Sequence, residues 1–250
     1  MHQGKKVAFV TGGTGGIGTA ICQELYTHGY FVVAGYYSSG NHGQAKEWAI
    51  KQKEDGYKLE IAYGEITKFD SCQKCINEIV EKFGKISILV NNAGITRDAT
   101  FSKMSLEQWT DVVSVNLNSV FMMTKLVIEG MLEEKWGRII NISSINAQKG
   151  QFGQSNYSAA KAGMHGFTKA LALEVARKGI TVNTISPGYI ETKMIADIDS
   201  AIKKEILKSI PMGRFGQPSE IGKLVSFLSS DSASFITGAN ISINGGQHMM

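Results

Sequence analysis

The sequence contains few cysteines, few prolines and no cluster of histidines. Three cysteines and three prolines occur in 250 residues, and the five histidines are scattered. So few cysteines do not make the disulfide framework of a small secreted protein. Cys72 and Cys75 have the spacing of a redox or metal pair, but no second pair accompanies them. They follow the apolar face of a predicted helix over residues 70–83, which favours buried structural thiols and predicts no metal site.

The sequence also lacks a long apolar run. No stretch approaches the roughly 20 apolar residues that cross a bilayer. The first residues lead straight into a predicted strand, which leaves no room for a secretory signal, so we expect a cytoplasmic protein. Low-complexity linkers and internal repeats are absent as well. Residues 1–250 are therefore predicted to form a single domain.

The sequence also lacks a strong excess of positive or negative charge. The chain has 26 Lys and Arg against 22 Asp and Glu, a net charge of +4. A mild positive excess helps to attract a polyphosphate ligand. It is not concentrated in the way that nucleic-acid binding requires. We therefore expect a small-molecule ligand, and neither nucleic acid nor membrane as a partner.

Short apolar runs recur along the chain, with segments of helical spacing between them. Runs of this length fit strands that are buried on both faces of a parallel sheet. The alternation predicts an α/β fold, a Rossmann-type doubly wound parallel sheet of about seven strands flanked by helices. The predicted strands cover residues 6–10, 31–34, 59–62, 88–90, 138–142, 181–185 and 240–243.

A glycine-rich turn connects the first predicted strand to a segment of helical spacing. It covers residues 11–18, and its glycines at 13, 15 and 18 match the G-x-G-x-x-G pattern of dinucleotide-binding proteins. Backbone N–H groups and the helix dipole would meet a pyrophosphate there, and glycine lets the backbone come close. A flexible glycine loop without a ligand is the alternative interpretation.

Tyr157 and Lys161 lie four residues apart, and Ser144 lies thirteen residues upstream. Positions i and i+4 share one face of a helix, so the phenol and the ammonium are predicted to point into one site. A neighbouring cation lowers the pKa of a phenol from its usual value near ~10, which suits proton transfer near neutral pH. The serine hydroxyl would hold a substrate oxygen beside the phenol. A surface Tyr–Lys pair is the alternative, because it has the same spacing.

Together these motifs resemble the short-chain dehydrogenase/reductase family, over nearly the whole chain from Lys6 onwards. The residues that carry the resemblance are 11–18, 91–94, Asn116, Ser144, Tyr157, Lys161, Pro187 and Gly188. The resemblance implies cofactor-binding motifs mainly in residues 6–116 and a catalytic and substrate part mainly in residues 138–250. It implies four catalytic residues, Asn116, Ser144, Tyr157 and Lys161, with Asn116 supporting a water that links Lys161 to solvent.

The resemblance also implies a nicotinamide cofactor. Its implied contacts are Gly12, Gly13, Thr14, Gly16, Ile17, Gly18, Gly64, Glu65, Ile66, Asn92, Ala93, Gly94, Tyr157, Lys161, Pro187, Gly188 and Ile190. No carboxylate follows the second predicted strand, where it would bind a ribose 2′-hydroxyl and select NAD, so we expect NADP(H). NAD stays open, because no arginine precedes Arg97. A 2′-phosphate would rely on Ser38, Ser39, Asn41, backbone N–H groups and Lys46.

Within the family the sequence looks most like acetoacetyl-CoA reductases, which make (R)-3-hydroxybutyryl-CoA for polyhydroxyalkanoate synthesis. Residues 91–98, 149–154 and 244–249 carry this likeness. The expected reaction is reduction of acetoacetyl-CoA by NADPH, with the proton from Tyr157. The implied substrate-binding residues are Asp98, Ser144, Gln151, Phe152, Gln154 and Tyr189. A simple connecting loop over residues 150–153 is the alternative.

Three other functions remain open. A 3-oxoacyl-[acyl-carrier-protein] reductase is closely related and shares residues 92–98, and Arg138 or the Arg177–Lys178 pair would then dock an acidic carrier protein. A general alcohol or sugar dehydrogenase of the same fold is the second. A nucleotide sensor without catalysis is the third, although it has no need of the proton-transfer residues. The resemblance further implies a homotetramer built through helices near residues 105–134 and 155–178, with C-terminal contacts.

Overall fold

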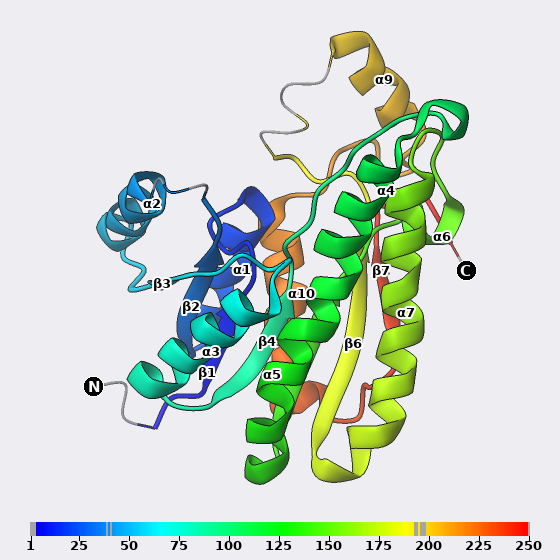
Figure 1. Ribbon diagram of the computed structural model, residues 1–250. Helices are drawn as coiled ribbons and strands as arrows, with labels where there is room; N and C mark the ends of the chain where they lie inside the picture. Colours follow the sequence, from blue (N-terminus) through cyan, green and yellow to red (C-terminus); the bar gives the residue numbers. More distant parts are fainter. Residues whose placement is uncertain (1–3, 39, 41, 193–194, 196–198, 250) are drawn as a thin grey trace.

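The computed structural model describes residues 4–38, 40, 42–192, 195 and 199–249. Its centre is one sheet of parallel strands in the order β3-β2-β1-β4-β5-β6-β7 (Figure 1). The strands are β1 (Val7–Val10), β2 (Phe31–Tyr36), β3 (Glu60–Tyr63), β4 (Ile86–Asn91), β5 (Gly137–Ile142), β6 (Ile180–Pro187) and β7 (Asn240–Ile243). Strand β1 pairs with β2 on one side and with β4 on the other. The strand order therefore reverses at β1, which places a ligand crevice beyond the carboxyl ends of β1 and β4.

Helices cover both faces of the sheet (Figure 1). They are α1 (Gly16–Thr27), α2 (Gly43–Glu54), α3 (Phe69–Phe83), α4 (Leu106–Val113), α5 (Ser119–Glu134), α6 (Asn146–Lys149), α7 (Ser155–Val175), α9 (Ser200–Lys208) and α10 (Pro218–Ser229). Short 3-10 turns occur at Phe101–Lys103, Ala176–Lys178 and Asp231–Ala233, and a π-helix, Ser114–Asn118, joins α4 to α5. Helix α9 stands apart above the edge where the strands end (Figure 1).

The core has two parts, one on each face of the sheet. Successive side chains of a strand point to opposite faces. Val7 and Phe9 of β1 accordingly pack in a cluster with α3, α5 and α7. Ala8 and Val10 pack in a second cluster with α1 and α10. The unbroken apolar runs of the sequence follow from this burial on both sides.

The sequence prediction of a parallel sheet flanked by helices is confirmed, with small changes at the strand ends. Strand β7 has the predicted limits, whereas β6 extends beyond the predicted residues 181–185 to Ile180–Pro187. One sheet serves the whole described chain, and the domain limits of 1–250 stay a prediction.

Cys72 and Cys75 lie buried on α3, as the apolar spacing of that helix predicts. Neither forms a disulfide. Burial raises the pKa of Cys72 to about 11 and that of Cys75 to about 12. Both are therefore protonated core thiols near neutral pH.

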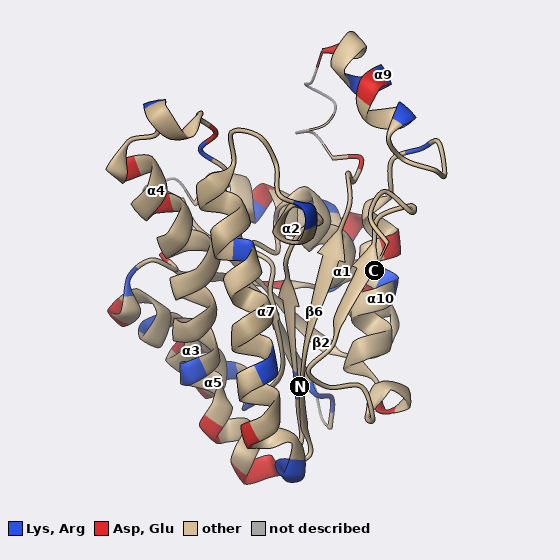
Figure 2. Ribbon diagram, turned by 90° about the vertical axis from the view of Figure 1, so that its right-hand side faces the viewer, with Lys and Arg blue, Asp and Glu red and all other residues tan. Residues whose placement is uncertain are grey.

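Lys and Arg positions alternate with Asp and Glu positions along the outer helices of the ribbon (Figure 2). One helical stretch, Leu106–Glu134, is long and apolar enough to cross a membrane by length and composition. Half of its most apolar window is buried within the structure. A buried core helix passes the same test, so this stretch is weak evidence for a membrane span.

Candidate active site

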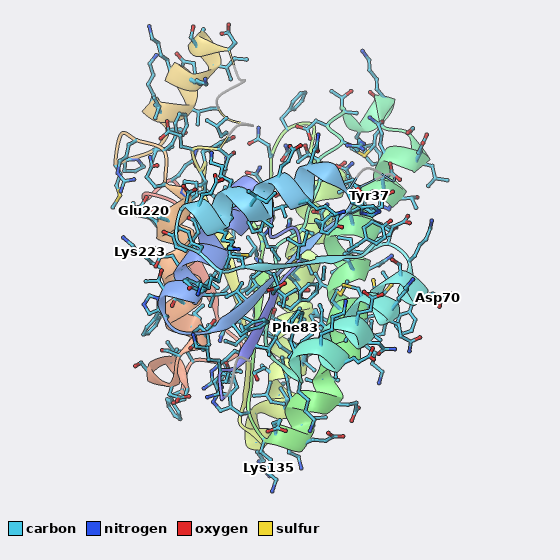
Figure 3. The ribbon with its side chains drawn as sticks, turned by 90° about the vertical axis from the view of Figure 1, so that its left-hand side faces the viewer. Tyr37, Asp70, Phe83, Lys135, Glu220 and Lys223 are labelled. Atoms are coloured by element: carbon cyan, nitrogen blue, oxygen red, sulfur yellow. The ribbon has the colours of Figure 1, made fainter. Side chains whose placement is uncertain are left out.

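The candidate residues gather where the central strands end. Parallel strands have their carboxyl ends at one edge, and the loops after β1, β4, β5 and β6 all leave from it. In Figure 3, Lys135 marks the opposite end of the molecule, where α5 stops. The motifs that the sequence separates by tens of residues are thus brought to one side of the sheet.

The glycine-rich turn is braced by the loop after β4. The hydroxyl oxygen of Thr11 accepts hydrogen bonds from the backbone N–H groups of Asn92 (3.0 Å) and Ala93 (3.1 Å). The Asn92 side chain in turn donates to the carbonyl oxygens of Thr11 (3.0 Å) and Gly12 (3.2 Å). These four bonds fix the two loops against each other and set the shape of the turn.

Two glycines of the turn have no space for a side chain. Gly12 has a φ of +62°, in the left-handed region that favours glycine. A Cβ atom on Gly13 would lie 2.7 Å from the backbone of Ala34. Helix α1 then begins at Gly16, and its N-cap, Gly15, has no side chain to cap it. The first N–H groups of α1 are thus available to an anion, which fits the pyrophosphate of a dinucleotide.

Thr192 lies next to the first residue of α1, and no motif in the sequence pointed to it. A Cβ atom on Gly16 would lie 3.1 Å from its methyl carbon. Thr192 follows β6, far from the turn in sequence, and only a family pattern would have pointed to it. Thr14, Ile17 and Gly18 lie in the same turn and first helical residues as predicted.

A small cavity of about 60 Å³ lies between the ends of the first four strands. Gly12, Gly64, Ile66 and Ala93, all predicted cofactor contacts, are among the residues that line it. No carboxylate is among its lining residues in the described part of the chain. This largely apolar cavity lies next to the glycine turn, on the side of the sheet where the adenosine half of a dinucleotide would bind.

Glu65 is held at the rim of this region. Its backbone N–H donates to the Ser71 hydroxyl (2.9 Å), and its carboxylate pairs with Lys68 (2.9 Å). The Glu65 carboxylate is therefore paired with Lys68, and a cofactor contact would come from the backbone of Glu65.

The end of β2 carries aromatic groups instead of a carboxylate. The Tyr36 hydroxyl and His42 Nδ1 are 2.9 Å apart, and the Tyr37 and Tyr63 rings stack with centroids 6.2 Å apart (Tyr37 is labelled in Figure 3). The Ser38 hydroxyl is buried and has no hydrogen-bond partner among the residues that the structure describes. A buried hydroxyl in need of a partner fits a phosphate contact. Ser39 and Asn41, the other predicted phosphate contacts, lie outside the described residues.

Tyr157 projects from the first turn of α7 beside Ser144, which follows β5. A hydrogen bond from Ser144 lowers the pKa of Tyr157, but desolvation by burial is larger and raises it, and Asp98 raises it further. The pKa of Tyr157 is therefore raised above its ordinary value. This differs from our expectation that Lys161 lowers it, because the fold removes water from the phenol and lowers the pKa of the lysine to about 7, so that only part of the lysine charge remains near neutral pH.

Lys161 is buried one turn further along α7. Its ammonium nitrogen donates to the carbonyl oxygen of Ile142 (2.7 Å) and lies 5.7 Å from the centre of the Tyr157 ring. Burial lowers its pKa to about 7. A lysine that releases and takes up a proton near neutral pH is suited to supply the neighbouring phenol.

Asn116 lies in the π-helix between α4 and α5 and is fully buried. Its amide accepts from the backbone N–H of Ile95 (3.1 Å) and donates to the carbonyl oxygens of Ile95 and Val112 (both 2.9 Å). A Cβ atom on Gly94 would lie 2.5 Å from Asn116 Oδ1 and 3.3 Å from Lys161 Nζ. The loop after β4 therefore packs directly against Asn116 and Lys161, and hydrogen bonds with Asn116 hold it there. Single π-turns inside helices are often found at functional sites.

The predicted substrate residues are only partly brought together. The Gln154 amide donates to Asp98 (2.8 Å) and accepts from the Asn146 amide (2.9 Å). Burial raises the pKa of Tyr189, and the negative charge of Asp98 raises it further, as it does the pKa of Tyr157. Asn146 links this group to the Ser144 hydroxyl through its backbone N–H (3.1 Å). No motif in the sequence pointed to Asn146.

Gln151 and Phe152 lie outside this group. The Phe152 side chain is 86% exposed, and Gln151 accepts a hydrogen bond from Lys149 (3.4 Å). These two residues lie in a short loop that points to solvent, and substrate contacts from them stay a prediction.

Arg138, the first candidate for docking a carrier protein, is buried at the start of β5, at the far edge of the sheet. It is not available to dock a carrier protein.

Pro187 is the last residue of β6, and Gly188 and Ile190 follow it in the next loop. The carbonyl oxygen of Pro187 accepts from the N–H of Ile145, and the N–H of Gly188 donates to Ile243. Tyr189 and Ile190 line a larger cavity of about 350 Å³ that continues towards β7 and the start of α10. No group of three or more potential metal ligands occurs among the described residues.

A doubly wound sheet, a glycine turn at its carboxyl edge and a buried Ser–Tyr–Lys group together define a nicotinamide-dependent oxidoreductase. A family model described as "Enoyl-(Acyl carrier protein) reductase" matches residues 12–248. The chain belongs to the short-chain dehydrogenase/reductase family.

Similar proteins match along nearly their whole length. An acetoacetyl-CoA reductase of Allochromatium vinosum is 51% identical over 98% of this chain and 99% of its own. An acetoacetyl-CoA reductase of Cupriavidus necator is 49% identical with the same coverage. A 3-oxoacyl-[acyl-carrier-protein] reductase of Pseudomonas aeruginosa is 43% identical over 98% of both chains.

Proposed function

We propose that the protein reduces acetoacetyl-CoA to (R)-3-hydroxybutyryl-CoA with NADPH. The observation that carries the proposal is the buried group in which a protonated Tyr157 meets the Ser144 hydroxyl, beside a lysine whose pKa is about 7. The names of the two relatives near 50% identity support the choice of substrate. The product fits a role in polyhydroxyalkanoate synthesis in the cytoplasm.

In this mechanism the chain supplies a proton and holds the substrate. When bound, the nicotinamide supplies the hydride that adds to the carbonyl carbon. Tyr157 gives its phenol proton to the carbonyl oxygen, and its raised pKa keeps that proton in place near neutral pH until it is needed. Ser144 donates a hydrogen bond to the same oxygen and orients it. Lys161 returns a proton to the phenolate, and its pKa of about 7 suits it to do so.

The Asp98–Gln154–Asn146 group would hold the thioester arm. Its three side chains are joined by two hydrogen bonds of 2.8 and 2.9 Å, so they form a rigid polar wall next to Ser144. The side-chain amide oxygen of Asn146 is buried and has no hydrogen-bond partner among the described residues. An acceptor in this state would take an N–H from the pantetheine part of the substrate.

NADPH is proposed over NADH for two reasons. The cavity at the end of β2 has no carboxylate among its lining residues in the described part of the chain, so nothing in it repels a 2′-phosphate. The buried Ser38 hydroxyl would gain the partner that it lacks.

The test is NADPH oxidation by the purified protein with acetoacetyl-CoA, run in parallel with NADH and with an acetoacetyl-carrier-protein conjugate. We expect fast turnover with NADPH and the CoA ester, and little with NADH or the conjugate. Preference for the conjugate would move the protein to fatty-acid synthesis, and no turnover with either thioester would refute the proposal.

Tyr157→Phe checks the catalytic assignment in the same assay. The change removes one oxygen and keeps the ring, so we expect loss of turnover by about 10³-fold or more, with the Kd for NADPH within about twofold of wild type. Fluorescence titration of NADPH measures the second quantity. A variant that keeps the wild-type rate would show that the proton comes from another group.

A further inference from the structure

Three consecutive residues at the exit of β5 each hold one part of the candidate active site. The Ile142 carbonyl oxygen accepts from the Lys161 ammonium (2.7 Å). The Ser143 hydroxyl donates to the carbonyl oxygen of Lys161 (2.9 Å). The Ser144 hydroxyl forms its hydrogen bond with Tyr157. Lys161 is thus bound to this segment at both its backbone and its side chain.

His165 stands behind Ser143, one turn beyond Lys161 on α7. Its Nε2 atom lies 3.0 Å from the Ser143 hydroxyl oxygen and 3.4 Å from that of Ser186. The Ser143 proton is already committed to the carbonyl oxygen of Lys161, because a carbonyl oxygen only accepts. His165 must therefore donate from Nε2, which fixes the tautomer of the neutral ring and directs the Ser143 proton towards Lys161.

The same ring reaches the next strands of the sheet. The Ser186 hydroxyl near the end of β6 donates to the side-chain oxygen of Asn240 on β7 (2.7 Å). Ser143 and Ser186 are buried, and His165 is half-buried between them. The ring thereby connects α7, one turn beyond Lys161, to the carboxyl ends of β5 and β6. Ser186 extends this connection to Asn240, the first residue of β7. Burial, followed by the charge of Lys169, lowers the pKa of His165, so the ring is neutral near neutral pH.

We infer that Ser143 and His165 act as a pair of positioning residues, which set the distance between the Ser144 hydroxyl on the β5 loop and the Tyr157–Lys161 face of α7. Neither residue needs to touch the substrate to do this. An error of about 1 Å in the placement of reacting groups costs on the order of 10²-fold in rate. The inference deepens the proposed function and rests on it for its kinetic part.

Ser143→Ala is the first variant to test. We expect kcat to fall about 10- to 100-fold, while the KM for acetoacetyl-CoA and the Kd for NADPH stay within about twofold, because Ser143 itself is not among the predicted substrate or cofactor contacts. Ser229→Ala is the matched control. Its hydroxyl is also buried and donates to a helix carbonyl oxygen (2.8 Å), but it lies on α10, away from the site. It should lose similar stability and keep kcat.

His165→Leu and His165→Gln test the other member of the pair. The leucine variant removes the donor, so kcat should fall, and the Ser143→Ala/His165→Leu double variant should be no slower than the slower single variant. The glutamine amide can donate to the Ser143 hydroxyl and should recover most of kcat. Losses that multiply in the double variant, or a Ser143→Ala variant with kcat within twofold of wild type, would overturn the inference.

A titration of the lysine side chains by nitrogen NMR gives a readout that needs no turnover. In the wild-type protein Lys161 should titrate near 7. In Ser143→Ala we expect a higher pKa, because a loosened Lys161 gains water. If the wild type turns over no 3-oxoacyl thioester, the proposed function fails, and this shift still decides the inference. An unchanged Lys161 pKa would refute it.

Discussion

At Gly94 the chain comes closer to the predicted catalytic side chains than any residue with a Cβ atom allows. The extra atom of Gly94→Ala would lie 2.5 Å from the Asn116 amide oxygen and 3.3 Å from the Lys161 nitrogen. We expect kcat to fall at least about 10-fold, because both side chains must shift. Gly130→Ala in α5 is the control, since its new atom would make only an ordinary contact of 3.7 Å with Lys85. Steady-state kinetics of the two variants make the comparison, and equal activity would contradict the expected clash.

Lys161 gives the stability of the protein a dependence on pH. Its pKa is about 7 in the folded chain and 10.5 when exposed. Between these values the unfolded chain holds a proton that the folded chain has released, so the unfavourable contribution of this group shrinks as the pH rises. The wild-type free energy of unfolding, minus that of Lys161→Met, should therefore increase from about pH 7 to about pH 9, by at most about 1.4 kcal/mol per pH unit. Urea unfolding at the two pH values measures the difference, and a constant difference would rule out this linkage.

At the scale of elements, the amino end of β5 is fixed by a buried cation. The Arg138 guanidinium donates to the carbonyl oxygens of Gly137 and Gly179 and to Asp231, and it lies 4.3 Å from the centre of the Trp136 ring. Arg138→Ala should lower the free energy of unfolding by roughly 2 kcal/mol or more, because these acceptors lose a buried donor.

The Arg138→Ala variant also distinguishes a structural role of Arg138 from a role in docking a carrier protein. Arg138→Ala should leave the KM for a carrier-protein thioester unchanged, since the side chain is buried at the edge opposite the site. Arg177→Ala, which removes an exposed arginine at the same end of the molecule, serves as the control for surface charge. A large rise in KM for Arg138→Ala alone would contradict this interpretation.

At the scale of the whole molecule, the predicted tetramer would cover apolar side chains that a single chain exposes. Phe121 on α5 is 56% exposed and Leu173 on α7 is 86% exposed, both within the helices expected at the interface. Leu173→Glu should therefore yield smaller species by light scattering after gel filtration, because a buried unpaired charge is costly. Ile50→Glu on α2, also an exposed apolar residue (59%), should keep the wild-type mass. Equal masses for all three proteins would place the interface elsewhere.

Much of the fold could be predicted from local patterns. Each predicted strand is present, since apolar runs of this length have to be buried on both faces of a sheet. The strand ends differ from the prediction. Strand β6 is longer than its apolar run, because Ile180 pairs with β5 and residues 186–187 pair with β7. The π-helix at Asn116 left no trace in the periodicity, because a single wider turn does not change the apolar pattern enough to be seen.

The sequence by itself determined the parallel sheet, the glycine turn and the residue types at its carboxyl edge, because periodicity, glycine and the i, i+4 spacing act over short distances along the chain. Only the tertiary structure decided how these groups behave. It shielded the phenol of the half-buried Tyr157 from water, and so raised a pKa that we expected to be lowered. It buried Arg138, left Phe152 exposed, and joined Ser143 to His165 across 22 residues. Burial and hydrogen bonding between distant segments depend on the order of the strands, which no local pattern contains.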